Sequence, residues 1–290
     1  MRRLFTFGCS FTKYGWPTWA DLLGETYWNL NWGNPGVGNR AIAERIVEAH
    51  TNFKFTKDDI IIVQWSSYIR HDYARPDIED SRTNMWKTKG NIFSKWNKKV
   101  FDDKWIKTFW NEQAYLLHTL HHIMLTQGFL ESIGCTWYMT SITDIEELRM
   151  CDTNENDPPT NVANLWEFDP SLMPYRECIW LEKEEHWLPP LLPEKWNTPE
   201  LDWWFDIDYK DKVARQIFVS KEVKFKEPHL TTLQHHNYLK NNGIYNLFGI
   251  SDDSKTPMII ESIKERAGTN QDKFLELLHE EIDSGTILGR

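Results

Sequence analysis

The sequence predicts an α/β protein built around a parallel sheet, because short apolar strands alternate with helical patterns through its first half. The clearest strand is DIIIVQ at residues 59–64, a continuous β-branched run typical of a parallel strand buried on both faces. The clearest helix spans residues 105–127, where apolar side chains recur at helical spacing until Gly128. We therefore expect a parallel sheet covered by helices on both faces.

The other elements follow the same alternation. Gly8 ends the first apolar run, Pro17 and Gly24 suit the first turn and the end of a helix, and Asn39 is placed to cap the helix after it. The expected strands are residues 4–7, 27–32, 59–64 and 134–141. The expected helices are residues 17–23, 40–50 and 105–127, a segment from 231 onward, 257–266 and 272–282.

The length of 290 residues fits one α/β core with an elaboration. Residues 144–210 are dense in proline and tryptophan, which is typical neither of a flexible linker nor of a regular element. We expect an ordered insertion that packs through its aromatic side chains and acts as a lid or binding wall. The predicted division is a core of residues 1–143 and 211–250, the insertion 144–210, and a C-terminal helical appendage at 251–290.

Composition narrows the classes of partner. The chain has 43 acidic and 33 basic residues, a net charge of −10, which argues against a nucleic-acid partner. No segment has the apolar length of a signal-peptide core or a membrane span. Four cysteines without a C-x-x-C pair favour free thiols in a reducing compartment: Cys9, Cys135, Cys151 and Cys178. We expect a cytoplasmic protein with neither a nucleic-acid nor a membrane partner.

Ser10 stands on the turn after the first strand, in LFTFGCSFT. Such strand ends carry reactive side chains in α/β enzymes, because backbone amides and a helix N-terminus converge there. A nucleophilic serine needs a neutral imidazole to accept its proton and an acceptor group that fixes the imidazole tautomer. Glu227 and His229, in KEPHLTTLQHHNYL, supply both groups late in the chain.

Two further turns are expected on the same sheet edge as Ser10. The Gly-rich turn at residues 33–38 and the pair Ser66 and Ser67 both follow predicted strands. Because the carboxyl ends of parallel strands share one edge of a sheet, these turns open beside Ser10. The sequence thus predicts a site made from three strand ends and a late histidine.

Four motifs follow one another along the chain in an order that resembles a known family. G-x-S-F comes first, N-x-G-x-x-G with a following Asn comes second, a buried strand with a polar end is third, and acid-x-His comes last. This order resembles the SGNH/GDSL hydrolase superfamily, and FTFGCSFT with WPTWADLL most resembles its branch encoded by marine tailed phages. The resemblance covers residues 1–140 and 213–245.

The resemblance implies a three-layer α/β/α sandwich with a flavodoxin-like parallel sheet. It also implies a serine esterase or acyl hydrolase that needs no metal and no cofactor. Carried over by position, Ser10 is the nucleophile, His229 the general base and Glu227 the orienting acid. The backbone amides of Ser10 and Gly36 are the expected oxyanion donors. The oxyanion and substrate-binding set is Gly36, Ser67 and Asn39.

Two positions depart from the family pattern. The family has an oxyanion Asn in a G-x-N-D turn, whereas this chain reads Trp65-Ser66-Ser67-Tyr68, so the Ser67 hydroxyl is expected to donate instead. The family acid is an Asp, often three residues before the His, whereas here the carboxylate is Glu227. The expected substrate is an ester, such as an O-acyl group on a glycan or cell-envelope polymer.

The alternative from another class is a phage structural or binding protein that keeps the fold but has lost the chemistry. The missing Asn and the bulky Trp65 favour that alternative. In both cases virion or homo-oligomer contacts are compatible with the sequence, and the location is the host cytoplasm or a virion.

Some other patterns have a simpler structural interpretation. Three histidines of the long predicted helix, His118, His121 and His122, fit a packing role better than a metal site, because no H-E-x-x-H pattern surrounds them. Cys9 is a rival nucleophile beside Ser10, but a buried turn cysteine is usually inert. Arg70 and Asp72 suit an ion pair that braces the end of the strand.

Overall fold

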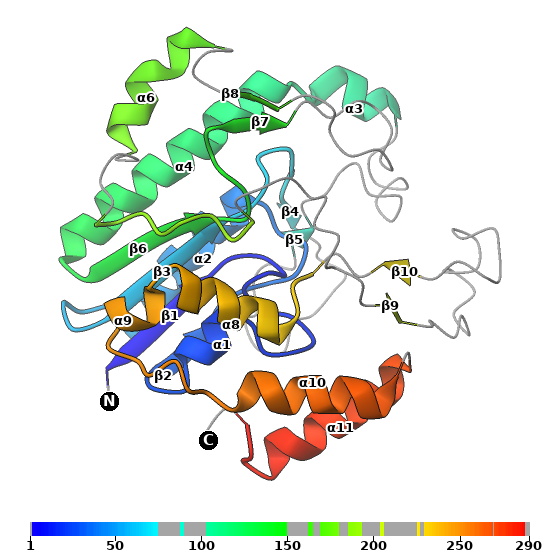
Figure 1. Cartoon of the computed structure of the whole chain (residues 1–290). Coiled ribbons are helices and arrows are strands. Elements are labelled where there is room, and N and C mark those ends of the chain that lie inside the picture. Colours follow the sequence, from blue (N-terminus) through cyan, green and yellow to red (C-terminus); the bar gives the residue numbers. More distant parts are fainter. Residues whose placement is uncertain are drawn as a thin grey trace. The chain divides into compact units, whose positions relative to one another are not determined.

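The computed structural model describes residues 2–74, 88–89, 103–149, 162–164, 169–179, 185–192, 204–205, 225–226, 229–268 and 270–287 (Figure 1). Its chain forms two compact units, each assembled from segments that are far apart in the sequence. The sheet unit comprises Met1–Lys13 and Leu30–Asn197, and the helical unit comprises Tyr14–Asn29 and Thr198–Arg290. The two units are described separately below.

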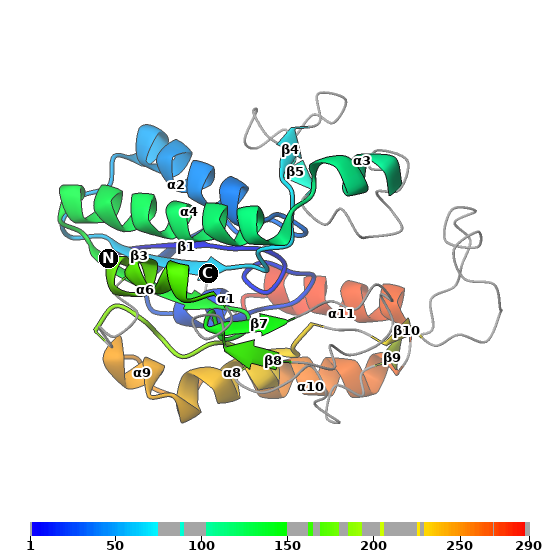
Figure 2. The ribbon, with the colours of Figure 1, turned by 90° about the horizontal axis from the view of Figure 1, so that it is seen from above.

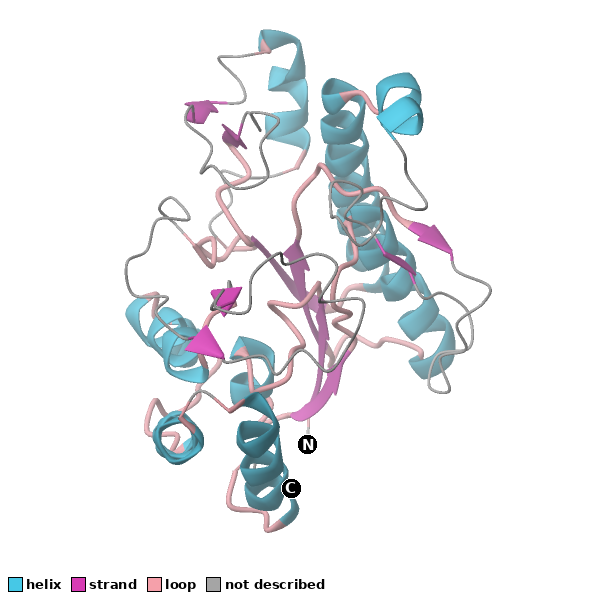
Figure 3. Cartoon of the chain, turned by 90° about the vertical axis from the view of Figure 1, so that its right-hand side faces the viewer, coloured by secondary structure: helices cyan, strands magenta, loops and turns pink. Residues whose placement is uncertain are grey.

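The main sheet has four strands in the order β2-β1-β3-β6. Its strands are drawn as magenta arrows in Figure 3. The central strand β3 runs parallel to both of its neighbours, with Leu4 opposite Ile60 and Gln64 opposite Thr140. All six residues of β3 are buried, which explains why its sequence is a continuous apolar and β-branched run. The α/β class is therefore confirmed. The strands are β1 (Arg3–Phe7), β2 (Trp28–Asn31), β3 (Ile60–Trp65) and β6 (Thr136–Ser141).

Two long helices belong to the sheet unit, α2 (Asn39–Phe53) and α4 (Glu112–Ile133). They lie side by side in Figure 2, and α2 also contacts β1 and β3. The expectation that Asn39 caps α2 is wrong: Gly38 is the cap residue and Asn39 is already helical. The reason is that the Asp72 carboxylate satisfies the first backbone amides of this helix, so the Asn39 side chain is used elsewhere.

The helix expected at residues 105–127 is two helices. The short helix α3 (Asp103–Phe109) ends first, and α4 then begins after Asn111, whose side chain accepts a hydrogen bond of 2.9 Å from the Ala114 backbone N–H. Gly128 lies inside α4 and does not end it. The helix ends at Gly134, which has a φ of 72° that favours glycine. The cap at Asn111 could not be recognised from the sequence, because the apolar pattern of residues 105–127 continues on both sides of it.

Part of the predicted insertion lies along the edge strand β6. Parallel bridges join Met139 to Trp187 and Thr143 to Leu192. The Leu188 N–H donates to the Met139 carbonyl at 2.8 Å, and the Leu192 N–H donates to the Ile142 carbonyl at 2.8 Å. Residues 186–192 therefore extend the hydrogen bonding of the sheet. Most of residues 144–210 lies outside the described residues, and the predicted bounds of the insertion stay a prediction.

Shorter elements complete the described chain. The sheet unit also contains the two-stranded pairs β4 (Tyr73–Ala74) with β5 (Thr88–Lys89) and β7 (Glu147–Arg149) with β8 (Val162–Asn164), the 3-10 helix η2 (Pro170–Leu172) and the helix α6 (Met173–Cys178). The helical unit contains the pair β9 (Trp204–Phe205) with β10 (Phe225–Lys226).

The helical unit joins an early segment of the chain to its C-terminal helices. Helix α1 contacts α8, α8 contacts α10, and α10 packs along α11. Thr231 caps α8 by accepting a hydrogen bond from the Gln234 N–H, while the Gln234 side chain accepts one from the Thr231 N–H. The predicted helices after residue 230 are confirmed. The helices are α1 (Trp19–Leu23), α8 (Thr232–Asn241), α9 (Ile244–Leu247), α10 (Thr256–Ala267) and α11 (Gln271–Asp283).

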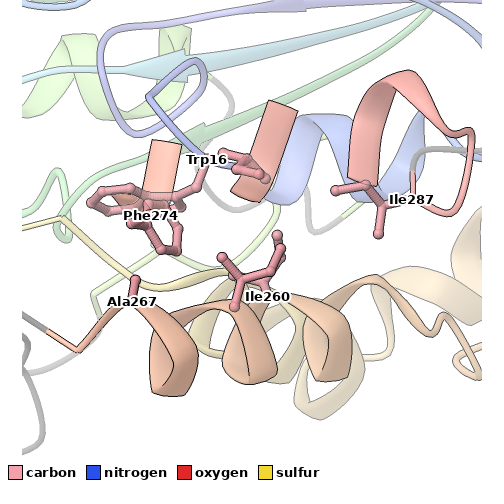
Figure 4. Close-up of a cluster of buried hydrophobic side chains, with 7 residues drawn as sticks. Trp16, Ile260, Ala267, Phe274 and Ile287 are labelled. Atoms are coloured by element: carbon pink, nitrogen blue, oxygen red, sulfur yellow. The ribbon is translucent and has the colours of Figure 1, made fainter. Parts of the chain in front are cut away.

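The C-terminal helices have an apolar core of their own with one member from the early segment. Trp16 is buried among side chains of α10 and α11 (Figure 4). The other members are Ile260, Ile263, Ala267, Phe274, Leu278 and Ile287. Residues 251–290 therefore pack on a segment that follows Ser10 closely in the chain.

Two sequence expectations concern the whole chain. In the part of the chain that the structure describes, no helix combines the length and the apolar character needed to cross a membrane. Cys9, Cys135 and Cys178 are free thiols, as predicted, and Cys151 lies outside the described residues. Burial raises the pKa of Cys135 to about 11.

A partly buried ion pair, with Asp59 as its buried member, anchors the start of the sheet. Arg3 donates to both carboxylate oxygens of Asp59, at 2.7 and 2.6 Å, and the Thr56 N–H donates to the same carboxylate at 2.6 Å. Burial alone would raise the pKa of Asp59, but the hydrogen bonds from Arg3 and Thr56 outweigh burial and lower it from the ordinary value of 3.8. The ionised pair therefore stabilises the fold above about pH 4.

We predict that Asp59→Asn lowers the free energy of unfolding by about 3 kcal/mol at pH 7, because it leaves a guanidinium without its buried partner. A lowered carboxyl pKa stabilises above its unfolded value and loses that contribution as the pH falls through the folded pKa. The difference between wild type and variant should therefore shrink below about pH 4 in urea unfolding. Glu44→Gln, which breaks the exposed Arg40–Glu44 pair, is the control, with an expected loss of about 0.5 kcal/mol or less. A pH-independent difference would contradict the assignment.

Candidate active site

Ser10 lies on a tight turn directly after β1 and is 7% exposed. The backbone N–H of Thr12 donates to the Cys9 carbonyl at 3.0 Å, and the Thr12 hydroxyl donates to Gln64 Oε1 at 2.8 Å. A Cβ at Gly8 would lie 2.0 Å from Thr12 Oγ1 and 3.1 Å from Gln64 Cβ. The turn that presents Ser10 can therefore form only with glycine at position 8.

The Gly-rich turn at residues 33–38 is bonded to the Ser10 turn. The Asn34 N–H donates to the Gly8 carbonyl at 3.0 Å. The side chain of Asn31 bridges the two turns, because its Nδ2 donates to the Thr12 carbonyl at 2.9 Å and its Oδ1 accepts from the Gly33 N–H at 3.0 Å. The structure thus brings together the first two of the three turns that the sequence placed on one edge.

Gly36 is a half-buried residue of this second turn. Its φ is +82°, in the left-handed region that favours glycine. Among the described residues, no heavy atom lies within 4 Å of the place where a Cβ would stand. There is therefore open space on the side of Gly36 where a side chain would stand.

Asn39 joins the second turn to the third, which follows β3. Its Oδ1 accepts from the Ser66 N–H at 2.7 Å, and its Nδ2 donates to the Ser66 carbonyl at 2.9 Å and to Thr119 Oγ1 at 3.1 Å. Asn39 is only 2% exposed. The side chain assigned to the oxyanion set from the sequence is engaged in fastening α2, the end of β3 and α4 to one another.

Arg70 and Asp72 brace this edge through backbone groups. Asp72 accepts from the N–H groups of Gly38 at 2.6 Å and Ala41 at 3.0 Å, and Arg70 donates to the Val37 carbonyl at 2.7 Å. Burial raises the pKa of Asp72, although the amides at the start of α2 and the nearby Arg70 charge act in the opposite direction. Both side chains therefore hold the Gly-rich turn against the third turn.

The end of β3 carries two buried polar groups: Ser66, which the sequence placed at this edge, and Gln64, which the sequence interpretation did not single out. Gln64 Nε2 and Ser66 Oγ are both buried, and neither has a hydrogen-bond partner among the residues that the structure describes. Buried donors without a partner in the fold are available to bound water or to a ligand. Ser67, the residue expected to donate, is half-buried. The bulky Trp65 lies in the core, where its indole N–H donates to Met139 Sδ at 3.3 Å.

His229 belongs to the helical unit, where it precedes α8 and is half-buried. Its ring stacks on Tyr14, with 3.9 Å between the ring centroids and 23° between the planes. The next carbonyl, of Leu230, accepts a hydrogen bond of 2.8 Å from the Trp16 indole N–H. Glu227, the expected orienting acid, lies outside the described residues. The role of Glu227 as the orienting acid therefore stays a prediction.

A second histidine, His235, lies near His229 on α8 and is buried. Burial, with a smaller effect from the nearby His229, lowers the pKa of His235 to about 3. His235 is therefore neutral at physiological pH. Within the described ranges, its Nδ1 has no hydrogen-bond partner.

Other candidates from the sequence have no support as reactive or metal-binding groups. Cys9 is fully buried, so a substrate has no access to its thiol. His121 Nε2 lies 3.2 Å from the Tyr175 hydroxyl oxygen, in a packing contact of α4 with α6. Within the described ranges, no cluster of three or more His, Cys, Asp or Glu side chains is arranged to hold a metal ion.

Comparison with models of known protein families gave no match, and comparison with curated protein sequences gave none either.

Proposed function

We propose that this protein is a serine hydrolase of the SGNH type that cleaves an ester. The observation that carries the proposal is the arrangement of the sheet unit, where three consecutive strand ends are bonded to one another around the Ser10 turn. Gly36 adds a backbone amide, and there is open space where a side chain at this position would stand. The part given to His229, which stacks on Tyr14 within the helical unit, rests on the family resemblance.

In the proposed reaction, Ser10 Oγ bonds to the acyl carbon while its proton passes to His229. The tetrahedral intermediate then breaks the ester C–O bond, and His229 gives the proton to the departing alcohol. Water attacks the acyl-serine in the same way, which releases a carboxylic acid and restores the Ser10 hydroxyl. Glu227 is proposed to orient the His229 imidazole.

The negative oxygen of the intermediate needs donors aimed at it. We propose the backbone amides of Ser10 and Gly36, together with a hydroxyl at the end of β3. The sequence pointed to Ser67 for the hydroxyl. Ser66 is a second candidate, because its buried Oγ has no hydrogen-bond partner in the described part of the chain.

The finer parts of the proposal rest on the family resemblance. They are the three-layer α/β/α arrangement, an O-acyl group on a glycan or cell-envelope polymer as substrate, and a phage origin with a place in the host cytoplasm or the virion. The Trp- and Pro-rich residues 144–210 are proposed to form the wall that contacts the substrate. No nucleic acid, membrane, metal or cofactor takes part in this mechanism.

A binding protein with the same fold is the second candidate function. The observation that favours it is the engagement of the Asn39 amide, which spends its hydrogen bonds on Ser66 and Thr119 and leaves none for an oxyanion. The buried position of Trp65, by contrast, removes one argument for this candidate, because its side chain lies in the core.

Labelling with a fluorophosphonate probe, followed by peptide mass mapping, separates the two candidates. A hydrolase is expected to carry one phosphonate per chain on Ser10, because the probe reacts only with an activated serine. A folded wild-type protein that takes up no label is not a serine hydrolase, and the binding protein then becomes the better proposal. Labelling of Ser66 would instead move the nucleophile to the end of β3.

A further inference from the structure

The C-terminal helices have no role in the reaction proposed above, yet a continuous row of aromatic rings joins them to His229. Phe274 of α11 meets Trp16 edge to face, with 6.2 Å between the ring centroids and 87° between the planes. Trp16 meets Tyr14 in the same manner at 4.5 Å, and Tyr14 stacks on His229 at 3.9 Å. All four residues belong to the helical unit.

Trp16 is the fixed link in this row. Its ring is 4% exposed and packs in the apolar core between α10 and α11, as Figure 4 shows. Its indole N–H donates to the carbonyl of Leu230, the residue directly after His229. A Cβ at the neighbouring Gly15 would lie 3.9 Å from Leu275 Cδ2, so α11 runs close to this segment. Helix α11 thus determines where Tyr14 and Leu230 lie.

We propose that the helical pair α10–α11 is a positioning device for the His229 imidazole, acting through Trp16 and Tyr14. A half-buried histidine before a helix has several rotamers to choose from, and a ring stacked on one face removes most of them. Edge-to-face and stacked contacts restrict the ring geometry beyond simple burial. Tyr14, Trp16 and Phe274 are therefore positioning residues, and the catalytic consequence of this proposal rests on the hydrolase function.

The row of ring contacts predicts that a substitution at Phe274 or Trp16 changes the position of the His229 ring. Phe274→Leu keeps an apolar side chain in the core of α10 and α11 but removes the ring that touches Trp16. Trp16→Phe keeps a ring but removes the donor to Leu230. Ile263→Val trims the same core from α10 without removing any ring, and it is the matched control.

Nuclear magnetic resonance of the full chain with labelled histidine tests the proposal without requiring activity. The ring current of Tyr14 should shift the His229 ring protons upfield, and Tyr14→Leu should abolish that shift. Phe274→Leu and Trp16→Phe should each move the His229 signals toward the values of a free histidine, while Ile263→Val leaves them in place. Unmoved His229 signals in folded Phe274→Leu and Trp16→Phe would overturn the proposal, whatever the protein's activity.

Steady-state kinetics with an activated ester test whether the position of His229 affects catalysis. Tyr14→Leu is expected to lower kcat by about 10- to 100-fold with KM changed by no more than about twofold, because misplacing the base affects the reaction more than binding. Tyr14→Phe keeps the stacked ring and should restore kcat. A wild-type protein without hydrolysis would contradict the proposed function but leave the magnetic resonance test of positioning intact. A Tyr14→Phe variant as slow as Tyr14→Leu would contradict positioning by the ring.

Discussion

Ser10→Ala is expected to lower the rate of hydrolysis of p-nitrophenyl acetate by about 10⁴-fold or more, to the level set by transition-state donors alone. Removing the nucleophile from a site of this kind abolishes the covalent route, whatever the oxyanion donors still contribute. The measurement is kcat/KM at neutral pH, with fluorophosphonate labelling on the same samples. The Ser10 turn is held by the hydrogen bonds of Thr12 with Cys9 and Gln64, so the variant should still fold, and its thermal melting curve checks this.

Two neighbouring serines provide the controls for this prediction. Ser66→Ala and Ser67→Ala each remove one hydroxyl from the turn after β3. Loss of one oxyanion donor typically costs about 100-fold in kcat, so the variant that slows identifies the donor. A Ser10→Ala protein that still hydrolyses the ester at a rate near wild type would exclude Ser10 as nucleophile.

The sequence predicted those parts of the fold that follow from local patterns. The run at residues 59–64 predicted a strand buried on both faces, and β3 is such a strand in the middle of the sheet. Gly8 and the Gly-rich turn could be recognised because a close approach of two backbones requires glycine, which is visible in the sequence. The placement of Ser10, Gly36 and Asn39 on one edge followed from the rule that parallel strands share their carboxyl ends.

What could not be predicted are the bonds between distant residues. Asn39 bonds to Ser66, 27 positions away, and Asp72 bonds to Gly38, 34 positions away. No local pattern distinguishes an amide that caps its own helix from one that fastens a remote turn, because both occur beside a glycine at a helix start. The break between α3 and α4 was missed for a related reason, since Asn111 stands within an apolar pattern that continues on both sides.

The role of residues 251–290 was hidden for the same physical reason. Amphipathic spacing predicted α10 and α11 but gave no sign of which segment covers their apolar faces. The structure shows that Trp16 is part of that core, which links the end of the chain to the residues that follow Ser10. The contact of Trp16 with α10 and α11 could therefore not be predicted from the sequence of either segment alone.

Asn39→Ala is expected to lower the free energy of unfolding by about 3 kcal/mol, because it leaves the Ser66 N–H, the Ser66 carbonyl and the Thr119 hydroxyl without partners in a buried place. For a protein of this size, such a loss corresponds to a melting temperature lower by about 6–10 °C. The measurement is urea unfolding together with thermal melting.

The same variant distinguishes the two roles considered for Asn39. If its amide fastens α2, β3 and α4, the variant loses stability, and its activity falls only as far as the turn at Ser66 moves. If the amide instead donates to the oxyanion, kcat falls by about 100-fold while the melting temperature stays near that of wild type. Ser67→Ala is the matched control, since a half-buried hydroxyl in the same turn should change stability by about 0.5 kcal/mol or less. The buried bonds of Asn39 lead us to expect the first result, and an unchanged melting temperature would contradict it.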